Sequence, residues 1–514
     1  MASTRVSAES MAKRPSNILF IVWDACRLDY AREHASTLMA LADDNLWFDH
    51  AIAPSSWSPP SHASLFTGQY PHSHRVSRIT DSMAGVKLFD RLHRGGYRCF
   101  GVSGNGFVSH NTDLHQHFDA LSYTSGQGPF QDGLTIYEHV YTDRRTGEDL
   151  PLVGATFDTI RAVLGHDHPI KSLVNFGAVG TNRLASHVEP LQRLRHPVFN
   201  PFQPYSYSPA RNTRQIRRFL EMGRDPDSPF FVFANYMDTH RPYLPPKPYR
   251  EALADCPPYP ELRRLNDEVA APWEFIRKTE EGKIDSADIE AIRTLYATEV
   301  SVADDHLRQL LDELTRRGLR ENTLIVVTAD HGENLGEQDR MGRRRMGHHA
   351  SVSEHLLRVP LVVAHPDLDG RRIDDLVSLK DLYALVTGGY ETVLRTGGAD
   401  LSCLQPADGI VESQYPATGG HELYDNHPTV PQAPLRERVE EDVAVAYRDG
   451  WKVVVKSTGE RWAWHRDEDV DVAAAPAKLL DRCENRLETL GGRDGGSPEL
   501  SRAEIDHLEA LGYL

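Results

Sequence analysis

Short apolar runs along the chain alternate with stretches in which apolar residues recur at every third or fourth position. Runs rich in Val, Ile and Phe predict buried strands, and the longer spacing predicts amphipathic helices. The leucines at 307, 310, 311 and 314 predict one such core-facing helix, with Gly318 as its stop. This alternation is typical of βαβ units in a largely parallel sheet. The clearest predicted strands are Ile18–Val22, Cys99–Val102, Phe230–Ala234, Leu324–Val327 and Leu361–Val363.

Polar side chains directly follow four of these strands. Because ligands of an open parallel sheet bind beyond the carboxyl ends of its strands, these side chains are candidates for one site. Carboxylates and imidazoles suit a divalent cation, and their spacing leaves Ca²⁺, Mg²⁺, Mn²⁺ and Zn²⁺ open. The candidates are Asp24, Asn105, Asp238, His240 and the run Asp330-His331-Gly332.

A serine stands at the predicted start of a short helix. Pro59 and Pro60 favour a first helical turn that begins at Ser58, and Gly68 favours a stop about two turns later. The unpaired backbone amides at such a start would hold an anion beside Ser58. Ser58 is therefore the candidate nucleophile.

The chain changes character at three places. Residues 1–15 are predicted to be a flexible tail before a catalytic domain over 16–390. Residues 121–209 lack periodicity, which is typical of an inserted lid or substrate-binding excursion. A C-terminal subdomain is predicted over 391–514, with a β-hairpin in which Val443–Tyr447 and Trp451–Lys456 flank the turn Arg448-Asp449-Gly450.

Composition narrows the partners. The chain has 514 residues, 40% of them hydrophobic, so it can bury a large core. Its net charge of −17 argues against a nucleic-acid partner. Five widely spaced cysteines indicate no disulfide framework, and the first fourteen residues contain no apolar segment. We therefore expect a cytoplasmic protein with no membrane partner; its oligomeric state is unreadable.

Several segments resemble the sulfatase family of the alkaline phosphatase superfamily. Ser58, Pro60 and Leu65–Pro71 match the family's nucleophile signature, with His62 in place of its Arg. The resemblance implies an α/β, alkaline-phosphatase-like core with a mostly parallel sheet flanked by helices, plus a smaller C-terminal α+β subdomain. The other similar segments are Asn17–Asp29, Asp238–Tyr243, Leu324–Glu333, Gly347–His349, Arg358–Leu361, Trp451–Trp464 and Leu508–Leu514.

The resemblance also implies roles for individual residues. It makes Asp24, Asp330 and His331 ligands of one divalent metal, with Ser58 at the metal as nucleophile. His240 and either His348 or His349 would contact the substrate anion or protonate the leaving oxygen, which suits groups that titrate near neutral pH. Further substrate contacts are expected from His62, Asn105 and Asp238. Ala25 stands where the family has a second Asp, so the metal stays open among Ca²⁺, Mn²⁺, Mg²⁺ and Zn²⁺.

The resemblance implies a metal-dependent hydrolase of sulfate esters, and the expected cytoplasmic location makes a small intracellular ester the expected substrate. The family often oxidises the nucleophile to formylglycine, but His62 replaces the Arg of that signature, so an unmodified Ser58 is the alternative. A metal-activated serine suits phosphorus chemistry well, which keeps phosphate mono- or diesters and phosphonate esters open. A third alternative is a transferase that passes the sulfuryl or phosphoryl group to an acceptor other than water. The fourth is a non-catalytic relative that keeps the fold for binding.

Overall fold

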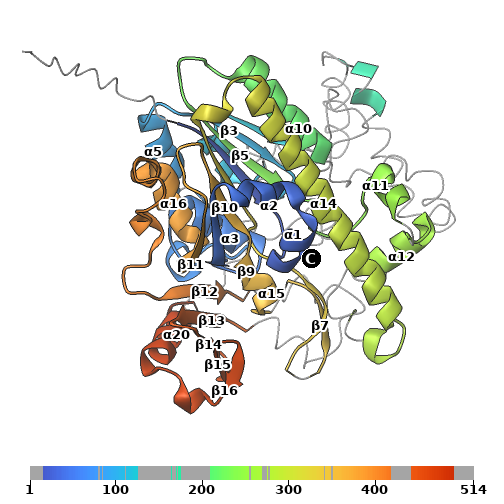
Figure 1. The fold of residues 1–514 in the computed structure, drawn as a ribbon. Coiled ribbons are helices and arrows are strands. Elements are labelled where there is room, and N and C mark those ends of the chain that lie inside the picture. Colours follow the sequence, from blue (N-terminus) through green and yellow to red (C-terminus); the bar gives the residue numbers. More distant parts are fainter. Residues whose placement is uncertain are drawn as a thin grey trace, which may run out of the picture.

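A nine-stranded sheet forms the centre of the computed structural model (Figure 1). Its strand order is β11-β2-β10-β6-β1-β5-β3-β4, with β9 paired to β2. The strands are β1 (Asn17–Trp23), β2 (Leu46–Ile52), β3 (Arg98–Ser103), β4 (Ala120–Tyr123), β5 (Phe230–Tyr236), β6 (Thr323–Thr328), β9 (Arg358–Val359), β10 (Leu361–Ala364) and β11 (Arg371–Ser378).

The sheet is mostly parallel. β1 pairs in parallel with β5 and with β6, and β3 pairs in parallel with β4 and β5. β9 and β10 run antiparallel to their neighbours. Every residue of β1, β5 and β6 is buried, as expected for central strands covered by helices on both faces. The predicted α/β class is confirmed, and each of the five predicted strands is present.

Helices cover both faces of the sheet (Figure 1). The long helix α14 packs against α1, α2 and α10 in one layer, while α3, α5 and α16 lie in the other. The leucines predicted at helical spacing lie on α14, and Gly318 follows its end with φ 65°. The bounds are α1 (Leu28–His34), α2 (Ser36–Asp43), α3 (Ser58–Thr67), α5 (Leu88–Arg94), α10 (Pro209–Arg218), α14 (Ser286–Arg316) and α16 (Leu382–Ala384).

A five-stranded antiparallel sheet and one helix follow the core. The predicted hairpin is formed by β13 and β14, whose two-residue turn Asp449-Gly450 has φ values of 51° and 80°. Positive φ at both positions matches the twist of a hairpin. The elements are β12 (Val411–Tyr415), β13 (Val443–Arg448), β14 (Trp451–Lys456), β15 (Arg461–His465), β16 (Glu468–Val470) and α20 (Ala477–Leu490).

The C-terminal sheet is packed on both faces. One face lies against α20 through Val453, Ala463 and Cys483. The other face joins a buried cluster with Ile52 and Trp57 of the core. The smaller sheet therefore adjoins the loop that precedes Ser58.

Parts of the chain lie outside this description. These include the predicted tail over 1–15, nearly all of the predicted insertion over 121–209, and the ending Leu508–Leu514. None of the helices within the described residues combines the length and apolar character needed to cross a membrane. The structure describes residues 16–78, 81–83, 85–109, 112–124, 164, 169–170, 172–174, 209–253, 256–268, 275, 278–340, 342–348, 351–417 and 441–490.

Candidate active site

Ser58 is the first residue of α3, as the sequence predicts. Trp57 before it is extended, with φ −153°, and Pro59 and Pro60 occupy the first turn. Gly68 ends the helix in the left-handed conformation, and its N–H donates to the Ser64 carbonyl at 2.9 Å. A proline-initiated start leaves the hydroxyl of Ser58 beside the amide end of the helix.

The Ser58 hydroxyl lies between two of the predicted metal ligands. Its Oγ is 3.3 Å from Asp24 Oδ1 and 3.2 Å from His331 Nε2. All three side chains are fully buried. β1 supplies Asp24 at its carboxyl end, and β6, the parallel neighbour of β1, ends just before His331. The carboxyl ends of these two parallel strands thus bring together residues that lie far apart in sequence.

Asp330 closes the cluster. Its Oδ1 accepts hydrogen bonds from the backbone N–H groups of Ala25 (3.1 Å) and His331 (2.9 Å). Its Oδ2 is 3.4 Å from His331 Nε2 and 3.4 Å from His62 Nδ1. Asp24, His62 and Asp330 each direct a ligand atom into one region in which these atoms lie within 4.8 Å of one another.

Gly332 allows the loop after β6 to approach a neighbouring segment. A Cβ at this position would meet the His355 carbonyl oxygen at 1.9 Å, a severe overlap with backbone. The Gly332 N–H donates to the Leu356 carbonyl at 2.8 Å. Glycine is therefore required after His331 because of close backbone packing.

Three histidine rings stand in contact at the site. The ring centroids of His331 and His348 are 4.5 Å apart, and those of His240 and His348 are 5.2 Å apart. Nδ1 of each ring has an oxygen partner: the Arg241 carbonyl for His240 (2.7 Å), the Gly332 carbonyl for His331 (2.8 Å) and Glu333 Oε1 for His348 (3.1 Å). These partners assign the proton to Nδ1, and Nε2 becomes the basic nitrogen of all three rings.

His62 lies one helical turn after Ser58. Its Nδ1 is 2.9 Å from the Ser58 carbonyl oxygen, and its Nε2 is 3.2 Å from Asn235 Nδ2. Donation from Nδ1 to the carbonyl holds the first turn of α3. The residue that replaces the Arg of the family signature thus contacts the backbone of Ser58 and the carboxylate of Asp330.

The remaining predicted residues are distributed differently. Asn105 Nδ2 donates to Asp24 Oδ2 at 2.6 Å, so this amide orients a carboxylate. Asp238 is buried, and its carboxylate interacts electrostatically with Glu299 of α14. Within the described residues, Asp238 forms no hydrogen bond or ion pair with Ser58, Asp24 or Asp330. His349 lies outside the described residues.

Burial dominates the electrostatics of the cluster. It raises the pKa of Asp24, and the neighbouring Asp330 carboxylate adds to that rise. Burial alone would raise the pKa of Asp330 too, but His331 and His62 outweigh it and lower the value. Burial lowers the pKa of His240 to about 4 and that of His348 well below its ordinary value. Two buried carboxylates side by side are a site where a cation is favoured.

A model of the sulfatase family matches residues 16–388, well over half of the chain. The chain belongs to the sulfatase family. This confirms the resemblance to the sulfatase family of the alkaline phosphatase superfamily that the sequence shows.

The similar proteins include both sulfatases and a sulfotransferase. The chain is 28% identical over 385 residues to the uncharacterized sulfatase YidJ of Escherichia coli. The aligned region covers 72% of this chain and 66% of YidJ. The chain is 38% identical over 265 residues to the low-salt glycan biosynthesis sulfotransferase Agl7 of Haloferax volcanii, covering 45% of the chain and 62% of Agl7. The chain thus spans a little under two thirds of both relatives.

The fold is also that of solved relatives. The phosphonate monoester hydrolase of Agrobacterium radiobacter superposes with a TM-score of 0.57 at 18% identity, over 92% of this chain and 95% of that one. Such a likeness concerns the fold alone.

Sequence reasoning missed two residues of the site. Asn235 Nδ2 donates to Asp24 Oδ2 at 3.2 Å, and the only signal is one amide within the apolar run of β5. Glu333 accepts from His348 and, at 3.1 Å, from the Tyr243 hydroxyl. An acid placed directly after Asp330-His331-Gly332 could have been singled out as a second-layer carboxylate.

Proposed function

We propose that this chain is a metal-dependent enzyme that cleaves sulfate esters with Ser58 as the nucleophile. The contact of Ser58 Oγ with Asp24 and His331 carries the proposal. A serine that only caps a helix would face the backbone amides of its own first turn. This hydroxyl instead contacts a carboxylate and an imidazole from two other strand ends, which is the arrangement of an activated nucleophile.

The donor set fits a divalent metal. Asp24 and Asp330 are both fully buried, and Asp330 Oδ2 accepts no well-directed hydrogen bond from the part of the chain that the structure describes. We assign Asp24, Asp330 and His331 as ligands, because the Nδ1 bond of His331 leaves Nε2 as the metal-binding nitrogen. A divalent cation held there would lower the pKa of the Ser58 hydroxyl and offset the charge of the ester.

His240 and His348 are proposed to act on the leaving group. Both are neutral in the absence of an anion because burial lowers their pKa values. A bound ester carries negative charge into the same buried space and would raise those values, so that one ring holds a proton on Nε2. That proton passes to the bridging oxygen as the bond between this oxygen and sulfur breaks, while Ser58 Oγ, whose own proton passes to solvent, bonds to sulfur.

The substrate is proposed to be a small sulfate ester. A net charge of −17 would repel a polyanionic chain, whereas a single ester group can be bound by a local cation and imidazoles. Water would then hydrolyse the seryl sulfate formed at Ser58, which releases sulfate and restores the serine.

Transfer to an acceptor is a second candidate, favoured by one observation. The 38% identity to the sulfotransferase Agl7 is higher than the identity to YidJ, although it covers less of the chain. In that case the acceptor hydroxyl takes the place of water, and the earlier steps are the same.

Mass spectrometry of the Ser58 peptide and the Ser58→Ala variant test the proposal. We expect Ser58→Ala to lose turnover of an aryl sulfate by at least about a thousandfold with an unchanged circular dichroism spectrum. Retained turnover would refute the assignment of the nucleophile. Loss of two hydrogens at Ser58 indicates formylglycine, and an intact serine indicates direct attack. An aryl phosphodiester and an aryl phosphonate run in parallel decide whether sulfur is the preferred centre.

A further inference from the structure

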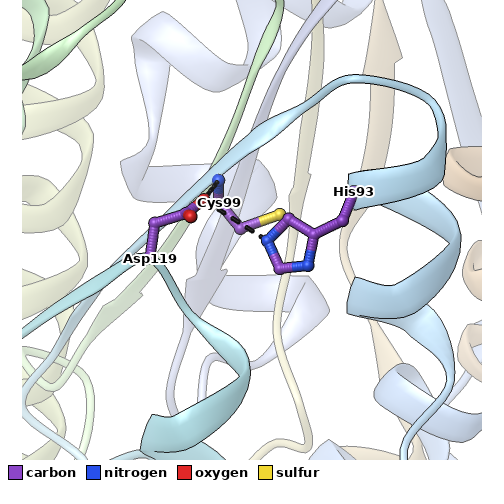
Figure 2. A group of neighbouring side chains, drawn as sticks. All are labelled: His93, Cys99 and Asp119. Carbon is purple, nitrogen blue, oxygen red and sulfur yellow. Dashed lines mark hydrogen bonds and ion pairs between the residues drawn. The ribbon is translucent and has the colours of Figure 1, made fainter.

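A histidine, a cysteine and an aspartate meet far from the Ser58 cluster (Figure 2). His93 lies in the last turn of α5, Cys99 is the second residue of β3, and Asp119 directly precedes β4. One ligand atom from each residue lies within 4.8 Å of the others. Asn105, at the other end of β3, contacts Asp24, so this group lies at the amino end of a strand whose carboxyl end adjoins the candidate active site.

The main chain fixes the positions of the three residues. The Asp119 N–H donates to the Cys99 carbonyl at 2.9 Å, and the Cys99 N–H donates to Asp119 Oδ2 at 2.6 Å. The parallel ladder of β3 and β4 then begins with the pair Phe100 and Ala120. A tight turn through Gly96, with φ 81°, returns the chain from α5 to β3 and keeps His93 beside Cys99.

The side chains converge on one another, as Figure 2 shows. His93 Nε2 is 3.3 Å from Asp119 Oδ2. Cys99 is fully buried, whereas His93 and Asp119 are 39% and 34% exposed. The group therefore has a closed thiol side and an open side that water and small ions can reach.

The three side chains offer one soft sulfur donor, one nitrogen donor and one hard oxygen donor. Ca²⁺ and Mg²⁺ prefer oxygen ligands throughout, whereas Zn²⁺ accepts sulfur, nitrogen and oxygen in a tetrahedral site. Ligand atoms of a tetrahedral zinc site lie about 3.5 Å apart. The observed limit of 4.8 Å needs only a small adjustment of two partly exposed side chains.

We propose that His93, Cys99 and Asp119 bind Zn²⁺ as a structural site that joins α5 to β3 and β4, with water as the fourth ligand. On binding, the Cys99 thiol loses its proton to solvent and its sulfur bonds to the metal. The ring proton of His93 moves to Nδ1 as Nε2 becomes a ligand, so one proton is released overall. Burial and the Asp119 charge raise the pKa of the Cys99 thiol, which keeps it protonated until a cation is present.

The competing explanation is an ordinary surface ion pair. Asp119 also lies 3.8 Å from Arg98 Nε, and Cys99 packs within the main core. In that case the three side chains would be close because of packing alone, and no metal would bind.

Cobalt titration of the whole metal-stripped protein separates these explanations, because a thiolate ligand gives a near-ultraviolet charge-transfer band that oxygen and nitrogen ligands do not. The Ser58 cluster as assigned contains no thiol, so a metal bound there adds no such band. We expect one band whose amplitude at saturation corresponds to one thiolate-bound cobalt per chain and that zinc abolishes.

Variants assign the band. Cys99→Ala should remove it, and Cys26→Ala should keep it, since Cys26 is equally buried but lies beside the active-site loop. His93→Gln, at a partly exposed position, should weaken cobalt binding at least tenfold with an unchanged circular dichroism spectrum and unchanged ester cleavage. This variant decides the case if Cys99→Ala does not fold. Absence of the band from the unaltered protein, or a band that persists in a folded Cys99→Ala or His93→Gln variant at full affinity, would overturn the proposal.

Discussion

Ala25 occupies a strained position between candidate metal ligands. It is fully buried, has φ 61° and donates its N–H to Asp330 Oδ1. The Tyr296 hydroxyl donates to the Ala25 carbonyl at 2.7 Å, which helps to hold this turn. Left-handed backbone is more common for Asp and Asn than for Ala. The turn is therefore compatible with the second Asp of the family pattern, although this chain lacks that carboxylate.

Restoring the carboxylate should change metal binding. We expect Ala25→Asp to bind Ca²⁺ at least about tenfold more tightly than the unaltered protein, because affinity for hard cations rises with the number of charged oxygen ligands. Isothermal titration of the metal-stripped protein measures the change. Ala25→Asn is the matched control, with the same shape and no charge. Equal binding by both variants would mean that position 25 does not face the metal.

Glu333 orients His348 through one hydrogen bond. We expect Glu333→Gln to lower kcat by about 10- to 100-fold, because the amide can present its NH₂ group to Nδ1 and favour the wrong ring tautomer. Bound metal should be unchanged, and the pH dependence of kcat should shift. Tyr243→Phe is the control, since it removes another hydrogen bond to Glu333 and leaves the bond to His348 in place. A Glu333→Gln enzyme with the kcat and pH profile of the unaltered protein would contradict this role.

At the level of residues, the sequence predicts much of the candidate site. Asp24, Asp330 and His331 follow strands that pair in parallel, so their convergence follows from topology. The orientation of each side chain does not follow from the topology. Asn105 follows β3 in the same way, yet its amide is turned toward Asp24. Asp238 follows β5, yet within the described residues it forms no hydrogen bond or ion pair with Ser58, Asp24 or Asp330. Side-chain direction depends on packing between elements, which periodicity does not encode.

The packing of α10 on α14 contains a histidine that titrates abnormally. His306 of α14 is 7% exposed, and its Nδ1 is 2.9 Å from the Thr213 hydroxyl of α10. Burial lowers its pKa to about 4. The unfolded chain therefore binds a proton near pH 6.5, where the folded chain does not.

This difference predicts a loss of stability in acid. As pH falls from 6.5 towards 4, the unfolded state gains a proton and the free energy of unfolding decreases. The contribution of His306 between pH 7 and pH 5 is about 2 kcal/mol. We expect His306→Gln to lose correspondingly less stability than the unaltered protein over that interval, measured by urea unfolding at both pH values. Parallel losses in the two proteins would show that His306 is protonated in the folded state.

Strands with polar residues were harder to predict than apolar ones. β2 carries Asp49 and His50 in its centre, and β11 places several charged residues at the edge of the sheet. Neither gives the continuous apolar run of a central strand. The antiparallel direction of β10 is equally hidden, because its apolar run is the same in either direction and only its connections set the pairing.

Glu412 connects the C-terminal helix to its sheet. This carboxylate of β12 is 2% exposed and pairs with Arg482 (2.7 Å) and Arg486 (2.7 Å) of α20. The backbone N–H of Glu412 donates to the Tyr70 hydroxyl of the core at 3.0 Å. One residue thus joins α20, the smaller sheet and the larger domain.

Removing this charge should loosen the smaller unit. We expect Glu412→Gln to lower the free energy of unfolding by about 3 kcal/mol, because two guanidinium groups lose a buried partner. Chemical denaturation with tryptophan fluorescence measures this, as Trp451, Trp462 and Trp464 all lie in the smaller sheet. Glu460→Gln, at a 55% exposed carboxylate paired with Lys456, is the control and should cost less than about 1 kcal/mol. Similar effects of both variants would refute the bridging role.

The sequence predicts the fold class of the whole molecule. It does not predict the contact between the two sheets. The apolar runs and the hairpin predict each sheet separately. The cluster that joins Trp57 to Val443 and Val445 depends on which faces meet, and such pairing across nearly 400 positions leaves no local signal.

The loop before Ser58 packs against the smaller sheet, so its support depends on a part of the chain that is translated much later. The Gln414 N–H donates to the Pro54 carbonyl at 2.8 Å, and Trp57 packs among residues of β12, β13 and β14. A ribosome translates position 58 nearly 400 residues before position 454. The nascent chain therefore carries its candidate nucleophile without the surface that supports it until the smaller sheet has been made.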